Sequence, residues 1–170
     1  MAYITRRRLL TLAISCSAAI TPSWPSSTTT SVSVSELRKV PTSVSVSSAV
    51  LRLQAEAWRD FMPTVRAATD PPGAPDGGRP MAVFFQLIHS GPRPTRPLHA
   101  RTLWVLQGDS VWETSVIEQS GDALDDVRMW VRGGPYWSPR SHVDVIVRFA
   151  DDQGKTFDLA ARDQLIQASS

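Results

Sequence analysis

Alternation of apolar and polar side chains is the feature that most restricts how this chain folds. It recurs in one segment after another from Ser43 onward, and in residues 143–149 every odd position carries valine or phenylalanine. A repeat of two is typical of β-strands, because successive side chains of a strand point to opposite faces. No window of twelve residues has the apolar spacing of an amphipathic helix, although 120–126 and 161–168 are each long enough for a helical turn. The sequence therefore predicts an all-β fold.

Turn signals divide the alternating region into short strands. Gly108 and Asp109 separate two alternating segments, and residues 151–155, which include Gly154, separate two others. Glycine close to aspartate favours the positive φ of tight hairpin turns. Short strands with such turns are typical of an immunoglobulin-like antiparallel β-sandwich, which we predict over residues 43–170. The seven expected strands are Val44–Trp58, Met81–His89, Arg101–Leu106, Val111–Ile117, Val127–Arg132, His142–Phe149 and Thr156–Ala160.

Residues 1–19 have the features of a secretory signal peptide. Three arginines at 6–8 precede the apolar run 9–20, which is too short to span a bilayer as a stable helix. Small residues at 17–19 suit a signal peptidase, with cleavage after Ala19. Residues 5–10 also resemble a twin-arginine signal, so the export route stays open. We therefore expect the protein to be exported to the periplasm or beyond the cell.

Cys16 offers an alternative to simple cleavage of the leader. Residues 13–16 are similar to a bacterial lipoprotein box, in which the cysteine is lipidated and becomes the N-terminus, although Ala13 stands where a larger aliphatic residue is usual. A lipid at Cys16 is the one membrane contact that we expect. This is the only cysteine, so the mature domain can form no internal disulfide, thiol nucleophile or cysteine metal site.

The segment 20–42 differs sharply in composition from the rest of the chain. Serine and threonine dominate it, with interspersed prolines, and the pattern Ser31–Ser35 recurs at Ser43–Ser47. Such a segment buries too little apolar surface to offset the entropy lost on ordering. We therefore predict a flexible, disordered Ser/Thr/Pro-rich spacer between the leader and the folded domain.

The charge balance argues against a nucleic-acid partner. The whole chain has 18 Lys+Arg and 16 Asp+Glu, which gives a net charge of +2. Three of the arginines lie in the predicted leader, and without them 15 basic residues (18 − 3) face 16 acidic ones. Binding a phosphate backbone requires a strong positive field. The mature protein is close to neutral and lacks one.

Four segments carry a resemblance to known proteins. They are 57–63 (AWRDFMP), 103–113 (LWVLQGDSVWE), 132–139 (RGGPYWSP) and the ending 143–166. They resemble an uncharacterised family of short bacterial exported proteins with a single β-rich domain, over most of residues 50–166. The resemblance implies export and one β domain, and it carries over no function and no catalytic residue.

Candidate catalytic and metal-binding groups are few. His89 and His99 flank a proline-rich loop, and with Asp144 they could supply two histidines and a carboxylate to one metal ion. Neither an HxH nor an HExxH spacing supports this hypothesis. Ser141 and His142 are adjacent on a predicted strand and therefore point to opposite faces, which prevents nucleophile activation. We expect no catalytic residue, no metal, no cofactor and no enzymatic activity.

Aromatic residues give better candidates for a binding surface. Tyr136 and Trp137 lie in the glycine- and proline-rich loop 133–139, and Trp58 and Arg59 lie where a predicted strand ends. Exposed, these side chains would bind a sugar face, a proline-rich peptide or a partner's hydrophobic residue. The alternative is that the loop aromatics fold back over the core. We take Tyr136, Trp137, Trp58 and Arg59 as the candidate binding surface.

These observations predict an exported β-sandwich that serves as a binding or envelope-accessory module for a protein or glycan partner. One alternative is a small inhibitor of secreted proteases that uses the proline-rich loop 71–80 or 90–97 as a rigid wedge, because the fixed φ of proline lowers the cost of ordering a loop. The second alternative is a metal-assisted hydrolase, which would require His89, His99 and a carboxylate to bind one metal ion.

Overall fold

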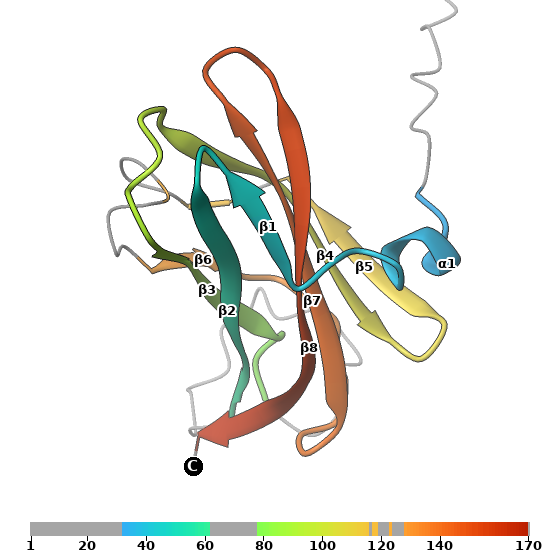
Figure 1. The fold of residues 1–170 in the computed structure, drawn as a ribbon. Coiled ribbons are helices and arrows are strands. Elements are labelled where there is room, and N and C mark those ends of the chain that lie inside the picture. The colour runs from blue at the N-terminus through green and yellow to red at the C-terminus, as the bar shows by residue number, and fades with distance from the viewer. Residues whose placement is uncertain (1–31, 62–77, 116, 119–122, 124–127, 170) are drawn as a thin grey trace, which may run out of the picture. The chain divides into compact units, whose positions relative to one another are not determined.

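Eight strands and one short helix make up the part of the chain that the structure describes. The structure is a computed structural model, and it describes residues 32–61, 78–115, 117–118, 123 and 128–169 (Figure 1). The predicted leader, including Cys16, lies outside the described residues. The elements are α1 (Val34–Leu37), β1 (Ser43–Val46), β2 (Ala49–Asp60), β3 (Ala82–Ser90), β4 (Leu98–Gln107), β5 (Ser110–Thr114), β6 (Met129–Val131), β7 (His142–Asp151) and β8 (Thr156–Ser169).

The strands form a curled, mixed sheet in the order β5-β4-β7-β8-β2-β3-β6, with β1 paired to β2 (Figure 1). Every neighbouring pair is antiparallel except β2 and β8, where residues 57–60 run parallel to residues 166–169. The all-β prediction is confirmed, as are the hairpins β4–β5 and β7–β8. The finer prediction of a purely antiparallel, immunoglobulin-like sandwich is not confirmed, because the sheet contains this parallel pair.

The parallel pair exists because β8 is longer than predicted. We expected a strand only to Ala160 and considered a helical turn over 161–168, but β8 continues to Ser169. Asp163 adopts φ +56°, and the β7–β8 register shifts between Val143 and Val145. β8 still pairs with β7 as far as Leu165, and its last four residues, 166–169, extend past the start of β7 and pair with β2. We refer to β4, β5, β7 and the first part of β8 as the β4–β7 half, and to the remaining strands as the β2–β3 half.

A tight turn divides a segment that we predicted as one strand. Val46 pairs with Ala49, and Ser47 and Ser48 between them both have positive φ, +48° and +70°. Two successive residues with positive φ are typical of a type I′ hairpin turn, which usually contains asparagine or glycine. Serine gives little signal for such a turn. The predicted strand Val44–Trp58 is therefore the hairpin of β1 and β2.

One face of each half contributes to a shared hydrophobic core. Burial alternates along β2 and the first part of β3, so that the odd-numbered residues from 49 to 59 and from 83 to 87 are buried. This is the period of two that the sequence displays. The largest fully buried side chains of the shared core are Leu51, Met81, Phe85, Leu87, Leu98, Leu103, Met129, Phe149, Leu159 and Ile166.

A second, smaller cluster lies on the outer face of the β4–β7 half, beneath α1. Ser33 and Glu36 form a capping box that begins α1, and Leu37 is only 1% exposed. Burial of the Leu37 side chain removes apolar surface from water, which offsets the conformational entropy lost when the segment is ordered. Residues 33–41 therefore belong to the folded unit, although we assigned them to the spacer. Leu37 packs against Trp104, Leu106, Ile146 and Ala160.

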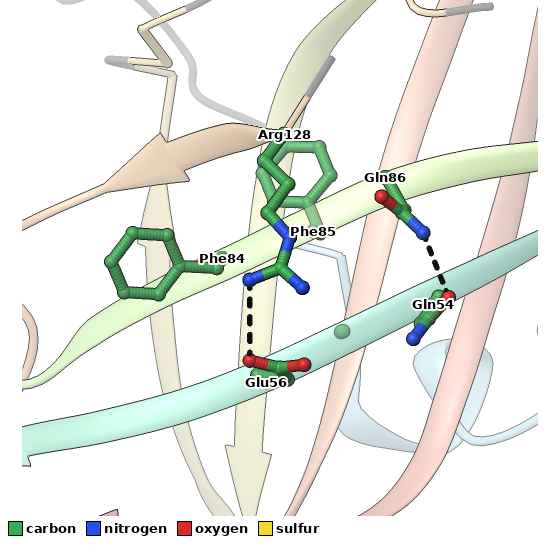
Figure 2. A pocket seen from close by; sticks show the side chains of 7 residues that line it. Gln54, Glu56, Phe84, Phe85, Gln86 and Arg128 are labelled. Carbon is green, nitrogen blue, oxygen red and sulfur yellow. Dashed lines mark hydrogen bonds and ion pairs between the residues drawn. The ribbon is translucent and has the colours of Figure 1, made fainter. Parts of the chain in front are cut away.

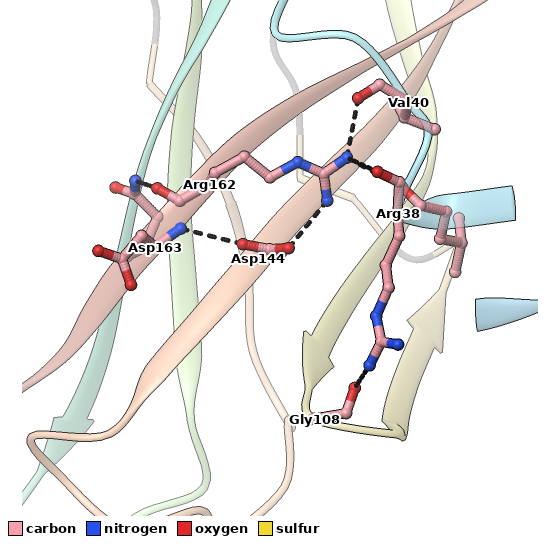
Figure 3. Close-up of polar contacts among 8 residues, drawn as sticks. Arg38, Val40, Gly108, Asp144, Arg162 and Asp163 are labelled. Atoms are coloured by element: carbon pink, nitrogen blue, oxygen red, sulfur yellow. Dashed lines mark hydrogen bonds and ion pairs between the residues drawn. The ribbon is translucent and has the colours of Figure 1, made fainter. Parts of the chain in front are cut away.

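Arg162 fixes the end of α1 to the sheet (Figure 3). Its guanidinium donates hydrogen bonds to the carbonyl oxygens of Leu37 at 3.0 Å, Arg38 at 3.1 Å and Val40 at 2.8 Å. The same group donates to the Asp144 carboxylate at 2.9 Å. A cation close to the last carbonyls of a helix satisfies acceptors that have no partner within the helix. This contact completes the attachment of residues 33–41.

Candidate functional site

The four residues of the predicted binding surface do not lie on one surface. Trp58 and Arg59 are neighbours on β2, so their side chains point to opposite faces of the sheet. Trp58 lies half-buried on the outer face, whereas Arg59 points inward and is only 5% exposed. The prediction that Arg59 belongs to an exposed surface is therefore wrong. Alternation within the strand would have separated the two residues at once.

Arg59 instead holds together three segments of chain. Its guanidinium donates hydrogen bonds to the carbonyl oxygens of Arg79 at 3.3 Å, Tyr136 at 3.5 Å and Trp137 at 3.2 Å. It also lies 4.6 Å from the ring centroid of Phe61 and 5.4 Å from that of Tyr136. Its Nη2 atom has no hydrogen-bond partner among the described residues. Such a buried cation is stabilised by its carbonyl and aromatic contacts, and its evident role is to position the loop.

Tyr136 and Trp137 lie close to the buried Arg59 and are themselves partly buried. Both are half-buried, and Trp137 packs against the shared core. The backbone of the loop pairs with the start of β3, since the Gly134 N–H donates to the Met81 carbonyl oxygen at 2.9 Å. Of the two alternatives for this loop, the structure agrees with aromatics that fold back over the core.

The outer face of the β2–β3 half carries an aromatic surface that the sequence analysis missed. Phe84 on β3 pairs directly with Trp130 on β6, and their rings are nearly parallel, with centroids 6.3 Å apart and planes 5° apart. The Arg132 guanidinium lies 3.5 Å from the Trp130 ring centroid. All three aromatic residues of this face, Trp58 included, are half-buried. The even positions of β3 are therefore partly open, whereas its odd positions from 83 to 87 are buried.

A hollow of about 360 Å³ lies on this face, next to the aromatic rings. Trp58 and Phe84 provide apolar walls, and Ala82, which precedes Phe84 by two residues on β3, contributes only a methyl group. Ala82 is the direct cross-strand partner of Trp58, so its short side chain leaves open space beside the indole. This volume is within the usual range for small-ligand sites. Arg132 and Gly133 line the hollow from the segment that follows β6.

Charged and polar groups border one end of the hollow. Arg79 forms an ion pair with Asp60 at 3.7 Å, and the Ser169 hydroxyl donates a hydrogen bond to the Asp60 carboxylate at 2.9 Å. Ser169 reaches this place because it pairs with Asp60 in the parallel β2–β8 contact. Both members of the ion pair remain accessible, with side-chain exposures of 59% for Arg79 and 37% for Asp60.

The same face continues as a row of polar side chains (Figure 2). The Gln86 amide donates to the Gln54 side-chain oxygen at 2.8 Å, and Arg128 lies 3.8 Å from the Glu56 carboxylate. Glu56 also accepts a hydrogen bond from the Trp58 indole N–H at 3.4 Å. That bond fixes the orientation of the indole beside the hollow. Polar side chains thus extend this face beyond the aromatic rings.

The structure does not bring together the groups considered for acid–base or metal chemistry. His89 lies on β3 and His99 on β4, and no group of three His, Cys, Asp or Glu side chains among the described residues has the geometry to hold a metal. The Asp144 carboxylate is held by Arg162 and by the Asp163 N–H at 3.0 Å.

Ser141 and His142, the pair considered for nucleophilic catalysis, each contact other residues instead of one another. His142 contacts Asp163 through its Nδ1 atom at 2.8 Å. The Ser141 hydroxyl donates to the Ser138 carbonyl oxygen at 2.5 Å and accepts a bond from Gln107 at 2.6 Å. None of these bonds joins the side chains of Ser141 and His142, as expected for adjacent residues in extended chain.

Comparison with known proteins adds no relative. No family model, curated protein or solved structure matches the chain. The resemblance to exported β-domain proteins therefore stays a prediction. In the described part of the chain, none of the helical structure has the length and apolar character needed to cross a bilayer.

Proposed function

We propose that this protein is an exported binding module, and that its ligand-binding surface is the hollow beside Trp58 and Phe84. The observation that carries this proposal is the hollow itself, which combines aromatic walls, a methyl floor at Ala82 and charged groups at one end. Binding sites commonly join apolar surface with a few polar groups that orient the ligand. The partner classes that fit are those expected from the sequence, a protein segment or a glycan.

The position of the aromatic rings supports a binding role over a purely structural one. Trp58, Phe84 and Trp130 lie on the outer face of the sheet, away from the shared core. Large aromatic side chains at a partly exposed surface are frequent energetic centres of interfaces. Phe85, by contrast, is only 2% exposed and belongs to the shared core.

Export completes the proposal. The leader 1–19 would be removed after Ala19, and residues 20–31 would then connect the mature N-terminus to the folded unit that begins at Val32. Lipidation of Cys16 is the alternative that would keep the domain at a membrane surface. In either case the hollow would meet ligands outside the cytoplasm.

A substitution that fills the hollow tests the binding surface. The full chain and its Ala82→Leu variant would be applied to a panel of oligosaccharides and peptides, with binding measured by titration calorimetry. The expected result is a ligand whose affinity falls at least about tenfold in Ala82→Leu, because the added side chain occupies the space. Ser45→Leu introduces a leucine at an exposed position of β1 and is the control. Equal binding by wild type and Ala82→Leu would refute the site.

The inhibitor alternative retains one supporting observation. In the loop 91–97, Pro94 is buried while its neighbours are exposed, and Arg96 forms an ion pair with Asp151 at 3.5 Å. A loop held at its centre and at one end would present a fixed shape to a protease. Inhibition of any member of a broad protease panel, lost on Pro94→Gly, would favour it. The other proposed loop, 71–80, lies mostly outside the described residues.

A further inference from the structure

The hollow has the dimensions of a site for a single ring. Trp58 on β2 and Arg132 after β6 lie on either side of β3, since Ala82 pairs with Trp58 and Val83 pairs with Val131. Neighbouring strands are about 4.8 Å apart, so the two walls stand about 10 Å apart across the sheet. One ring fits between them, above the Ala82 methyl group.

The apolar lining of the hollow includes the aromatic side chains of Trp58 and Phe84. The indole of Trp58 is oriented by its hydrogen bond to Glu56, and the Phe84 ring lies nearly parallel to that of Trp130. An aromatic face carries partial negative charge and attracts groups with partial positive hydrogens. The C–H groups on one side of a pyranose ring are such hydrogens. A sugar ring is therefore well suited to these walls.

The charges around the hollow favour a ligand with one negative group. Asp60 is paired with Arg79, and Glu56 is paired with Arg128. Arg132 has no ion pair among the described residues, and its guanidinium lies over the Trp130 ring. A guanidinium binds a carboxylate through two parallel hydrogen bonds, and it keeps its aromatic contact while doing so. The unpaired positive charge thus lies where the wall of the hollow meets the aromatic surface.

Other ligand classes fit the site less well. The hollow lies on the face of a sheet, where backbone N–H and C=O groups are directed towards neighbouring strands and not towards a ligand. An extended peptide lying across β2 and β3 would find no main-chain partners, because both strands are paired on both sides. Single-stranded nucleic acid needs a positively charged groove along its backbone, and here Arg132 is the one arginine lining the hollow that has no acidic partner among the described residues. Recognition must come from side chains, which suits a ligand rich in hydroxyl groups.

The geometry points to an acidic saccharide as the ligand, with the sugar ring over Ala82, between Trp58 and Arg132 and beside Phe84, and with its carboxylate on the Arg132 guanidinium. Hydroxyl groups of the sugar meet the polar groups of Arg79, Asp60 and Ser169 at the end of the hollow. This inference rests on the proposed function, because it names the ligand class of that same site.

The test compares an acidic oligosaccharide with its uncharged derivative. Titration calorimetry on the full chain would use oligogalacturonate, its methyl ester, poly-glutamate and a single-stranded DNA oligonucleotide. The variants are Arg132→Gln and the control Arg52→Gln. Arg52 is exposed on the same face of β2, six residues from Trp58, which is about 20 Å along the strand. Circular dichroism would establish that both variants are folded.

The outcomes distinguish the saccharide assignment from the more general proposal of a binding module. We expect oligogalacturonate to bind, its ester to bind at least about tenfold more weakly, Arg132→Gln to lose at least about tenfold in affinity and Arg52→Gln to bind like wild type. Equal binding of acid and ester, tighter binding of poly-glutamate or DNA, or an unchanged affinity of Arg132→Gln would overturn the saccharide assignment and leave a binding module. Failure of these probes and of the whole oligosaccharide and peptide panel would overturn the proposed function as well.

Discussion

Leu37 provides the sharpest test of where the folded unit begins. Its side chain is 1% exposed and packs between α1 and the outer face of β4 and β7. Truncation of a fully buried leucine to alanine costs about 2–5 kcal/mol of unfolding free energy. We expect the lower half of that range for Leu37→Ala, about 2–3 kcal/mol, because half-buried Val34 and Val40 flank the cluster and can relax into the space.

Thermal and urea denaturation of the full chain would measure this change. For a folded unit of this size, about 1 kcal/mol moves the melting temperature by about 3–5 °C, so the expected decrease is about 6–15 °C. Lys39→Ala shortens an exposed side chain of the same segment and should change stability by less than about 0.5 kcal/mol. A Leu37→Ala protein that melts with the control would refute the packing of residues 33–41 and restore them to the spacer.

Three further predictions follow from other parts of the molecule. Arg59→Met should lower the unfolding free energy by about 2–4 kcal/mol, since it leaves three partly buried carbonyl oxygens without their donor. A loss below about 0.5 kcal/mol in urea denaturation would contradict the role of Arg59. Burial alone would raise the pKa of Asp151, but the N–H groups of Lys155 and Gln153 together with Arg96 outweigh it and hold that pKa below its ordinary value. Asp151 therefore stabilises the fold at neutral pH and loses this effect as the pH falls through its lowered pKa. The Asp151→Asn variant should be less stable than wild type at pH 7, and the two stabilities should converge in acid. Parallel curves of stability against pH would contradict this. Mass spectrometry of exported protein should find an N-terminus after Ala19, a lipidated N-terminal Cys16 would establish the alternative, and an intact chain retained in the cytosol would refute export.

The strands were predictable because their signal is local. Alternation alone identifies the core face of β2, and the glycine-containing turns identify both long hairpins. The turn at Ser47 and Ser48 gave no such signal, because serine is not specific for positive φ. The capping box of Ser33 and Glu36 was visible in the sequence, and the serine-rich composition around it concealed its meaning.

The binding surface was harder to predict because it depends on pairing between distant segments. Trp58 was identified as a candidate, but the wall opposite it comes from β3 and from the residues after β6. Ser169 contacts Asp60 only because the last part of β8 runs parallel to β2. Local periodicity contains no information about which strands become neighbours, so the hollow could not be found without the topology.

The continuity of β8 through both halves of the sheet has a consequence for cooperativity. The two halves share one hydrophobic core and one strand, so neither can open while the other keeps its packing. Denaturation monitored by tryptophan fluorescence and by circular dichroism should then give superimposable transitions. Ligand bound between Trp58 and Arg132 would accordingly protect core residues of the β4–β7 half, such as Val145, from hydrogen exchange, because they are exposed by the same global unfolding event.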